Sequence, residues 1–99
     1  MYKDIINYEL AEAKTEAHLL KVAERILKEW MRHKSGFVKW EIHQNANGHY
    51  TDIVYWQSKE DAKNAEKEMG NIPNASEWFE CYKEGSISSK NLTLINTFE

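Results

Sequence analysis

Residues 36–57 read GFVKWEIHQNANGHYTDIVYWQ, and this stretch decides the predicted fold. Two runs of alternating side chains flank Asn47-Gly48, a dipeptide typical of a two-residue hairpin turn in which both central residues need positive φ. The stretch therefore predicts an antiparallel hairpin with a type I′ turn. Everything else in the chain is placed relative to this hairpin.

The predicted turn sets the register of the hairpin by pairing Ala46 with His49. Because side chains alternate between faces, one face then gathers apolar residues and reads as the core. Its members are Val38, the pair Ile42–Ile53 and the pair Trp40–Tyr55. The pairs expected on the other face are Lys39–Trp56, Glu41–Val54 and His43–Asp52.

The composition is that of one ordinary globular domain, which we expect to span residues 1–99. Hydrophobic residues make up 41% of the chain and charged residues 29%, and a chain of this size can bury a core without disulfides or metal. The net charge is −3, from 16 acidic against 13 basic residues, and no basic cluster stands out. Nucleic acid is therefore not an expected partner.

The single cysteine, Cys81, excludes an internal disulfide and fits a reducing cytoplasm. We expect a cytoplasmic protein, because the N-terminus has no apolar signal stretch and no apolar run approaches the roughly 20 residues of a membrane span. Four histidines and one cysteine show no zinc-ligand spacing, so no metal is predicted. No glycine-rich phosphate loop or nucleotide fingerprint occurs, and no cofactor is predicted. Cys81 is expected to be a buried small residue.

Periodicity places the remaining elements on both sides of the hairpin. Thr15 is a candidate N-cap for the long helix, and Ser58 opens an [ST]-x-x-[DE] capping box. Gly70 is expected to close the second helix. The predicted elements are a strand at 4–11, a helix at 15–33, a helix at 58–69, a helical turn within 71–80 that carries Trp78 and Phe79, and a strand at 92–96.

This order, β-α-β-β-α-β, predicts an α+β ferredoxin-like protomer, with an antiparallel sheet and two helices on one of its faces. The opposite face would be bare and partly apolar in a monomer. Because large exposed apolar patches mark interaction sites, we expect a homodimer packed sheet to sheet. The pattern leaves open which face of the sheet the helices cover.

The element order and residues 54–62, VYWQSKEDA, resemble the dimeric α/β-barrel superfamily and, within it, the antibiotic-biosynthesis-monooxygenase-like proteins. In that family the third strand often ends in a tryptophan, and a helix start rich in Ser and Glu follows. The resemblance covers nearly the full chain. It implies a barrel made by the sheets of two protomers, and either oxidation of aromatic polyketides without metal or flavin, or haem degradation.

The resemblance also implies site residues. Polyketide-oxidising members use asparagine, tryptophan and tyrosine in a pocket between sheet and helices. Asn7 and Trp56 match the first two by position, and Tyr8, Tyr50 or Tyr55 could supply the third.

Haem-degrading members add a histidine about one helix after the tryptophan, but Glu66 and Lys67 stand in that region. Haem degradation is therefore the function that the sequence supports least.

His43 and Asp52 are the catalytic candidates that the residues themselves suggest. A carboxylate opposite an imidazole can fix its tautomer and raise its pKa, which prepares a general base. The alternative is an ordinary cross-strand pair. The hairpin pattern assigns Trp40 to the core, whereas the resemblance assigns Trp56 to the pocket, and the sequence does not decide which of the two lines it.

Together these observations predict a small homodimer that binds a modest aromatic or apolar ligand, with cofactor-independent monooxygenase-like chemistry. The predicted ligand-binding residues are Asn7, Tyr8, Trp40, Tyr55 and Trp56. The alternative is a structural or interaction module without enzymatic activity, in which the aromatic residues build the dimer. No membrane association is expected in either case.

Overall fold

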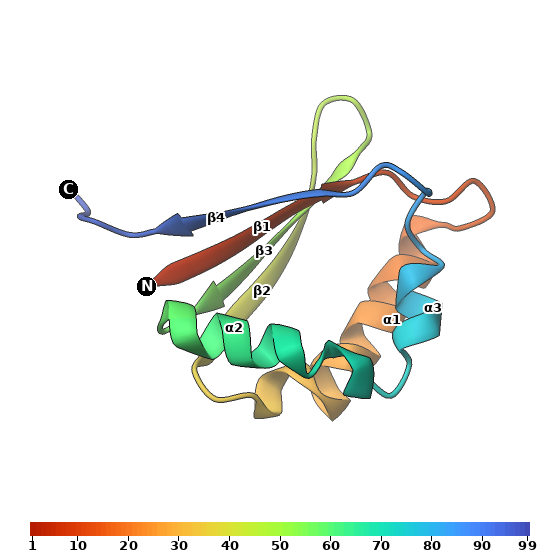
Figure 1. Ribbon diagram of the computed structural model, residues 1–99. Coiled ribbons are helices and arrows are strands. Elements are labelled where there is room, and N and C mark those ends of the chain that lie inside the picture. The colour runs from red at the N-terminus through yellow and green to blue at the C-terminus, as the bar shows by residue number, and fades with distance from the viewer.

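Four strands form one antiparallel sheet in the computed structural model, which describes all 99 residues (Figure 1). Their order across the sheet is β2-β3-β1-β4. The strands are β1 (Tyr2–Tyr8), β2 (Phe37–Gln44), β3 (Tyr50–Trp56) and β4 (Ser88–Thr93). The helices are α1 (Glu16–Glu29), α2 (Lys59–Lys67) and the short α3 (Ala75–Phe79). This arrangement confirms the predicted α+β ferredoxin-like fold.

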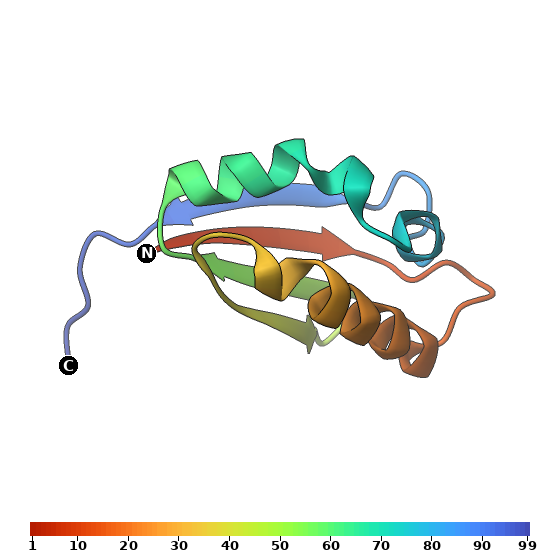
Figure 2. The same ribbon diagram turned by 90° about the horizontal axis from the view of Figure 1, so that it is seen from below.

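All three helices lie on the same side of the sheet, as the two views in Figures 1 and 2 agree. The opposite side carries no helix, and we call it the helix-free face. The core lies between sheet and helices, where fifteen hydrophobic residues are buried, and Cys81 among them has no exposed surface. The prediction of a buried Cys81 is therefore confirmed. None of the helices has the length and apolar character that a membrane crossing requires.

The long helix α1 begins where the sequence predicts. The Thr15 hydroxyl accepts a hydrogen bond from the backbone N–H of His18 at 3.2 Å, which satisfies one of the free donors of the first turn. Its buried face, Leu19, Val22, Ala23 and Ile26, repeats at helical spacing. The helix ends at Glu29 rather than at residue 33, because a separate 3₁₀ turn follows at Met31–His33.

The predicted N-cap of α2 at Ser58 is also confirmed, although the Asp61 carboxylate accepts from the Ser58 hydroxyl at 2.9 Å rather than from its backbone N–H as in a full capping box. The Ser58 hydroxyl accepts a hydrogen bond from the backbone N–H of Asp61 at 3.1 Å. Ala62 and Ala65 are buried, and such small side chains let this helix approach the sheet closely. The predicted role of Gly70 is wrong, because α2 ends at Lys67 and Gly70 lies in a 3₁₀ turn without positive φ.

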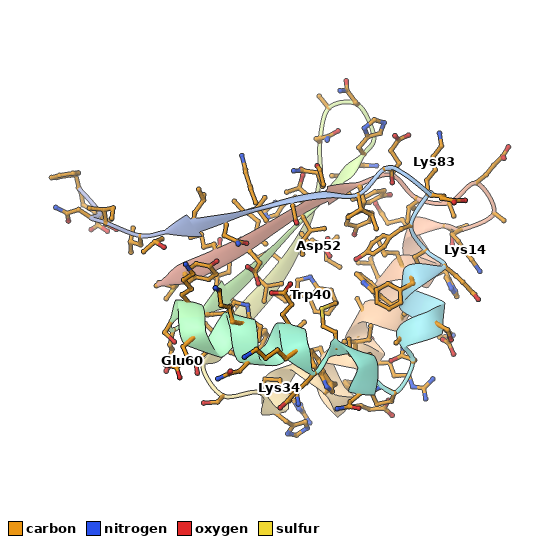
Figure 3. All side chains as sticks on the ribbon, viewed as in Figure 1. Lys14, Lys34, Trp40, Asp52, Glu60 and Lys83 are labelled. Carbon is orange, nitrogen blue, oxygen red and sulfur yellow. The ribbon has the colours of Figure 1, made fainter.

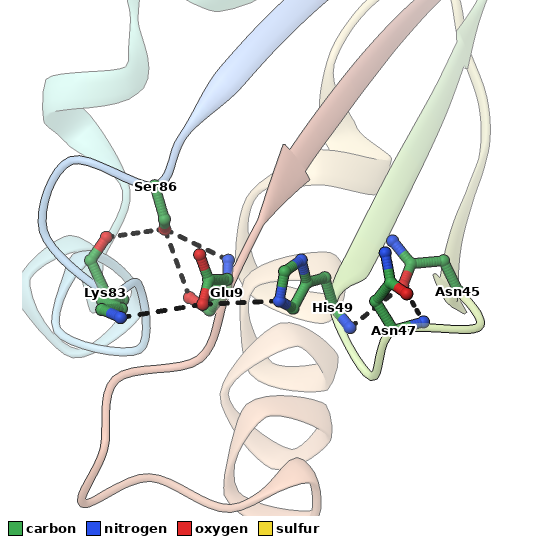
Figure 4. Close-up of polar contacts among 6 residues, drawn as sticks. All are labelled: Glu9, Asn45, Asn47, His49, Lys83 and Ser86. Atoms are coloured by element: carbon green, nitrogen blue, oxygen red, sulfur yellow. Dashed lines mark hydrogen bonds and ion pairs between the residues drawn. The ribbon is translucent and has the colours of Figure 1, made fainter.

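The hairpin forms, but the predicted turn and register are wrong. Gly48 alone has positive φ, +79°, and the loop has three residues closed by a hydrogen bond from the backbone N–H of Asn45 to the carbonyl of His49 at 2.8 Å. The side-chain oxygen of Asn45 stabilises this loop, because it accepts from the backbone N–H groups of Asn47 and His49 at 2.9 and 3.1 Å (Figure 4).

The longer loop shifts the pairs near the turn by one residue, and a bulge between Phe37 and Lys39 shifts the partner of Trp56 by two, from Lys39 to Phe37. Trp40 lies opposite Val54, and Ile42 lies opposite Asp52. Trp40 therefore shares a face with Trp56, whereas the predicted register separates them. The helices cover this shared face, which answers the question that the sequence left open.

The carboxylate of Glu9, just after β1, ties the hairpin tip to the chain that leads into β4. His49 Nε2 lies 3.4 Å and Lys83 Nζ 3.7 Å from its Oε1 (Figure 4). The backbone N–H of Glu9 donates to the Ser86 hydroxyl at 3.1 Å. The last strand, β4, spans Ser88–Thr93 rather than the predicted 92–96, and it pairs with β1.

Candidate functional site

A cavity of about 330 Å³ lies between the sheet and the helices. Fifteen of its twenty lining residues are hydrophobic, and all four tryptophans of the chain are among them. A concave, mostly apolar space with a few polar groups is the usual form of a small-molecule site. The polar groups are Asp4, Asp52, Glu66, Ser89 and Asn91. Figure 3 shows Trp40 and Asp52 in the space between the sheet and the helices.

Strand alternation places Asp52 on the buried face of β3. Tyr50, Val54 and Trp56 share this face, and Asp52 itself is only 1% exposed. The Tyr8 hydroxyl donates to one carboxylate oxygen at 2.7 Å, and Trp40 Nε1 donates to the other at 3.2 Å. The two hydrogen bonds hold the carboxylate in one orientation at the wall of the cavity.

Burial changes the acidity of this group. It raises the pKa of Asp52 to about 6, although the hydrogen bonds from Tyr8 and Trp40 favour the charged form. Burial and the neighbouring carboxylate also raise the pKa of Tyr8, so Tyr8 stays a hydrogen-bond donor. At neutral pH Asp52 is therefore a carboxylate whose proton affinity exceeds that of an exposed aspartate, as a general base requires.

A second carboxylate, Asp4 of β1, lies on the same face of the sheet. It accepts a hydrogen bond from Trp56 Nε1 at 3.2 Å. In the side-chain orientation that satisfies its amide, Asn91 donates to Asp4 at 2.8 Å and accepts from the Tyr2 hydroxyl at 2.9 Å. Burial raises the pKa of Asp4, and the negative charge of Glu66 raises it further.

Exposed lining residues mark the mouth of the cavity. Met69, Phe79 and Ile87 line it and are 37%, 49% and 50% exposed. Glu66 of α2 and Asn91 of β4 are exposed lining residues as well. The cavity therefore opens between the α2–α3 segment and strand β4.

The structure brings together only some of the site residues predicted from the sequence. Trp40, Asp52 and Trp56 line the cavity, and Tyr8 contacts Asp52. Both Trp40 and Trp56 line the cavity, because the observed register puts them on the same face of the sheet.

Asn7 and Tyr55 lie on the helix-free face instead. Asn7 accepts a hydrogen bond from the Thr51 hydroxyl at 2.6 Å, and the Tyr55 hydroxyl donates to Glu41 at 2.8 Å. Lys39 Nζ lies 4.6 Å from the centre of the Tyr55 ring. Neither residue lines the cavity, because both have the strand parity opposite to that of Asp52.

The predicted His43–Asp52 pair does not form. His43 lies opposite Thr51 on the helix-free face, where its Nε2 is 3.1 Å from Glu41. The register shift separates the two candidates, because residues one position apart on a strand point to opposite faces.

Several cavity residues escaped the sequence reasoning. Asp4 has the same parity on β1 as Tyr8, so the strand pattern could have placed it on the buried face. Trp30 and Trp78 reach the cavity from the end of α1 and from α3. Trp30 continues the apolar spacing of α1, four residues after Ile26, but helical spacing alone does not distinguish a cavity residue from a core residue.

No three His, Cys, Asp or Glu side chains come together in an arrangement that could hold a metal ion. None of the four histidines lines the cavity, so a haem placed there would have no imidazole ligand.

The fold and the cavity together define a ferredoxin-like domain with a mostly apolar cavity between sheet and helices. No family model matches the sequence, and no curated protein matches it. Solved structures match it well. The cofactor-independent oxygenase SnoaB from Streptomyces nogalater superposes with a TM-score of 0.77 at 15% identity, over 97% of this chain and 94% of that one.

Two further structures are similar over most of their length. The monooxygenase ActVA-Orf6 of Streptomyces coelicolor, in complex with nanaomycin D, has a TM-score of 0.69 at 13% identity, over 99% of this chain and 90% of that one. A putative antibiotic biosynthesis monooxygenase from Bordetella bronchiseptica has a TM-score of 0.73 at 13% identity, over 96% and 98%. The resemblance to antibiotic-biosynthesis-monooxygenase-like proteins is thus confirmed at the level of the fold.

Proposed function

We propose that the protein binds a small aromatic or apolar molecule in the cavity and oxidises it without a metal or an organic cofactor. The observation that carries this proposal is a buried carboxylate, Asp52, in the wall of a cavity lined by four indoles. An ionisable group with a perturbed pKa inside a cleft is a functional-site candidate on physical grounds. SnoaB, which shares the fold, is a cofactor-independent oxygenase, and this supports the proposal by analogy.

The proposed chemistry begins with proton transfer to Asp52. A ligand whose CH₂ group is acidified by flanking aryl or carbonyl groups loses one proton to the carboxylate, and its carbanion is left in an apolar space. The carbanion reduces O₂ by one electron, and the two radicals combine to a peroxide. Loss of water from the protonated peroxide gives a ketone, so that CH₂ and O₂ become C=O and H₂O, with O₂ as the oxidant.

Tyr8 and Trp40 have positioning roles in this scheme. Their hydrogen bonds to the two oxygens of Asp52 hold the carboxylate in place and stabilise its charged form. Trp56 supplies an indole wall to the ligand, and its own N–H is already bonded to Asp4.

Binding and turnover can be tested separately with anthrone, an aromatic probe that carries such a CH₂ group. We expect the protein to bind anthrone and to consume O₂ as the ketone forms, measured with an oxygen electrode. Asp52→Asn should retain binding and lose turnover by about 100-fold or more, the usual contribution of a general base. Trp56→Ala should fold and lose affinity. Unchanged turnover in Asp52→Asn would reject Asp52 as the base.

We propose in addition that the protein is a homodimer packed through the helix-free face. This face presents Ile5, Ile53, Tyr55 and Leu92, and Leu92 is 47% exposed in the isolated protomer. Native mass spectrometry should give about 2 × 11.7 = 23.4 kDa. Ile53→Glu should give a monomer, and Leu20→Glu, on the exposed surface of α1, serves as the matched control.

The alternative, a structural module without enzymatic activity, requires aromatic residues at the dimer interface, and fewer of them are available there than the sequence suggests. The four tryptophans line the cavity on the helix side, so they are not available to a sheet-to-sheet interface. Of the four aromatic residues predicted above to bind the ligand, Tyr8, Trp40, Tyr55 and Trp56, only Tyr55 lies on the helix-free face. A dimer that binds no probe would favour this alternative.

We also propose a cytoplasmic location. Cys81 is a free thiol with no exposed surface, and its burial raises the thiol pKa, so the reactive thiolate is disfavoured. A lone unpaired cysteine is usual in a reducing compartment.

A further inference from the structure

The charges that line the cavity have one sign. Asp4, Asp52 and Glu66 are acidic, and none of the twenty lining residues is Lys, Arg or His. Asp4 lies opposite Val54 on β3, two residues from Asp52 on the same face, so the two aspartates are diagonal neighbours, roughly 7–8 Å apart along the backbone and somewhat closer at their Cβ atoms. A carboxylate or phosphate ligand would meet these groups without a basic lining residue to offset them; Lys34, whose Nζ lies 4.8 Å from the centre of the Trp30 ring, is itself paired with Glu68.

The indoles add a second, independent feature. A tryptophan face attracts cations more strongly than any other side-chain ring. The cavity holds all four, Trp30, Trp40, Trp56 and Trp78, and the rings of Trp40 and Trp78 meet edge to face with centroids 5.3 Å apart. Aromatic walls combined with carboxylates are the composition that recognises organic ammonium groups.

The hydrogen-bonding atoms of the cavity also favour a donor ligand. The indole N–H groups of Trp40 and Trp56 are already used by Asp52 and Asp4. A carboxylate offers about four lone-pair positions, so both aspartates can accept further bonds. Against these acceptors stands one buried N–H donor without a partner, the indole nitrogen of Trp30, so the free acceptor positions outnumber the free buried N–H donors among the lining side chains.

We propose that the ligand of this cavity is an organic cation, a protonated or quaternary amine carried on an aromatic or apolar body. The inference rests on the proposed ligand-binding function of the cavity and adds the charge of the ligand. Glu66, exposed at the mouth, would attract the cation by its charge. The ammonium group would then lie against Asp4 and the indole faces, and its positive charge would favour the carboxylate form of Asp52.

Three probes of matched shape test the charge preference: 2-naphthylmethylammonium, 2-methylnaphthalene and 2-naphthoate. Their affinities are measured by quenching of the tryptophan fluorescence and by calorimetry at low salt. We expect the ammonium probe to bind at least about tenfold more tightly than the neutral probe, and the carboxylate probe not to bind measurably. Asp4→Asn should remove most of that advantage and leave the affinity for 2-methylnaphthalene unchanged.

Two further variants keep the test independent of folding. Glu66→Gln removes a charge at the exposed mouth and should weaken only the ammonium probe, by about threefold. Glu60→Gln, also exposed on α2 but outside the cavity, is the matched control and should change nothing.

The possible outcomes separate the two proposals. Equal affinity for the ammonium and neutral probes, or tighter binding of the carboxylate, overturns the cation inference and leaves the ligand-binding function standing. If the protein binds none of the three probes, both the proposed ligand-binding function and the cation inference are rejected.

Discussion

Replacing Asp52 by asparagine should change the stability of the protein in a way that reverses sign with pH. The pKa of Asp52 rises from the usual 3.8 to about 6 on folding. A raised carboxylate pKa means that the group's contribution is most favourable below pH 3.8 and is lost as the pH rises through 6. The rise of about two pH units corresponds to about 3 kcal/mol, and ionised Asp52 therefore destabilises the fold by that amount at neutral pH.

Asparagine has nearly the same shape and no charge, but it can accept only one of the two hydrogen bonds. Its oxygen can take the Tyr8 hydroxyl, whereas its NH₂ group would face the Trp40 N–H, a donor against a donor. The lost bond costs about 1 kcal/mol. Asp52→Asn should thus be about 1 kcal/mol less stable than the wild type near pH 3 and about 2 kcal/mol more stable near pH 8.

Urea denaturation of both proteins at several pH values measures this difference directly. Taking the difference between variant and wild type cancels the titration of all other groups, Asp4 included. Glu60→Gln, on the exposed surface of α2, controls for the loss of one negative charge. A stability difference that stays constant from about pH 4 to pH 8 would refute the argument, because Asp52 would then have an ordinary pKa and no special claim to act as a base.

Three other changes follow from local geometry and are checked by urea denaturation or calorimetry. Gly36→Ala should cost more than about 2 kcal/mol, because an added Cβ would lie 2.1 Å from the Asp61 carboxylate at a φ of +78°. Gly48→Ala, with φ +79° and no neighbour within 4 Å, should cost only the backbone strain of about 1 kcal/mol. Ser58→Ala should remove the cap of α2 and about 1 kcal/mol, with Ser89→Ala, which makes no hydrogen bond through its side chain in the structure, as control.

The order of the elements could be predicted because it depends on local signals. Thr15 and Ser58 cap their helices as expected, and the alternation in the two hairpin strands is strong enough to identify both. The antiparallel sheet with helices on one face follows from that order and from short connections. The helix caps and the strand alternation each depend only on residues that are close together in the sequence.

The register could not be predicted from the Asn47-Gly48 dipeptide alone. The observed loop depends on the side chain of Asn45, which bonds two backbone N–H groups and favours a three-residue loop with glycine in the left-handed conformation. A change of one residue in loop length moves Trp40 from one face to the other. The same one-residue difference explains the wrong His43–Asp52 pair, because the predicted register puts these residues opposite each other and the observed register puts them on opposite faces.

The position of Asp52 in its strand is itself an argument for function. Tyr50, Val54 and Trp56 bury apolar side chains on the same face, and the alternation of β3 calls for a hydrophobic residue between them. An ionised aspartate there weakens the fold at neutral pH, and the buried Tyr8 and the partly buried Trp40 each donate their single side-chain hydrogen bond to it. Side-chain patterning, packing and electrostatics favour the same residue at most positions of a protein, and the positions where they disagree tend to be functional sites. The same conflict at the wall of a cavity is best explained if the carboxylate acts on what the cavity binds.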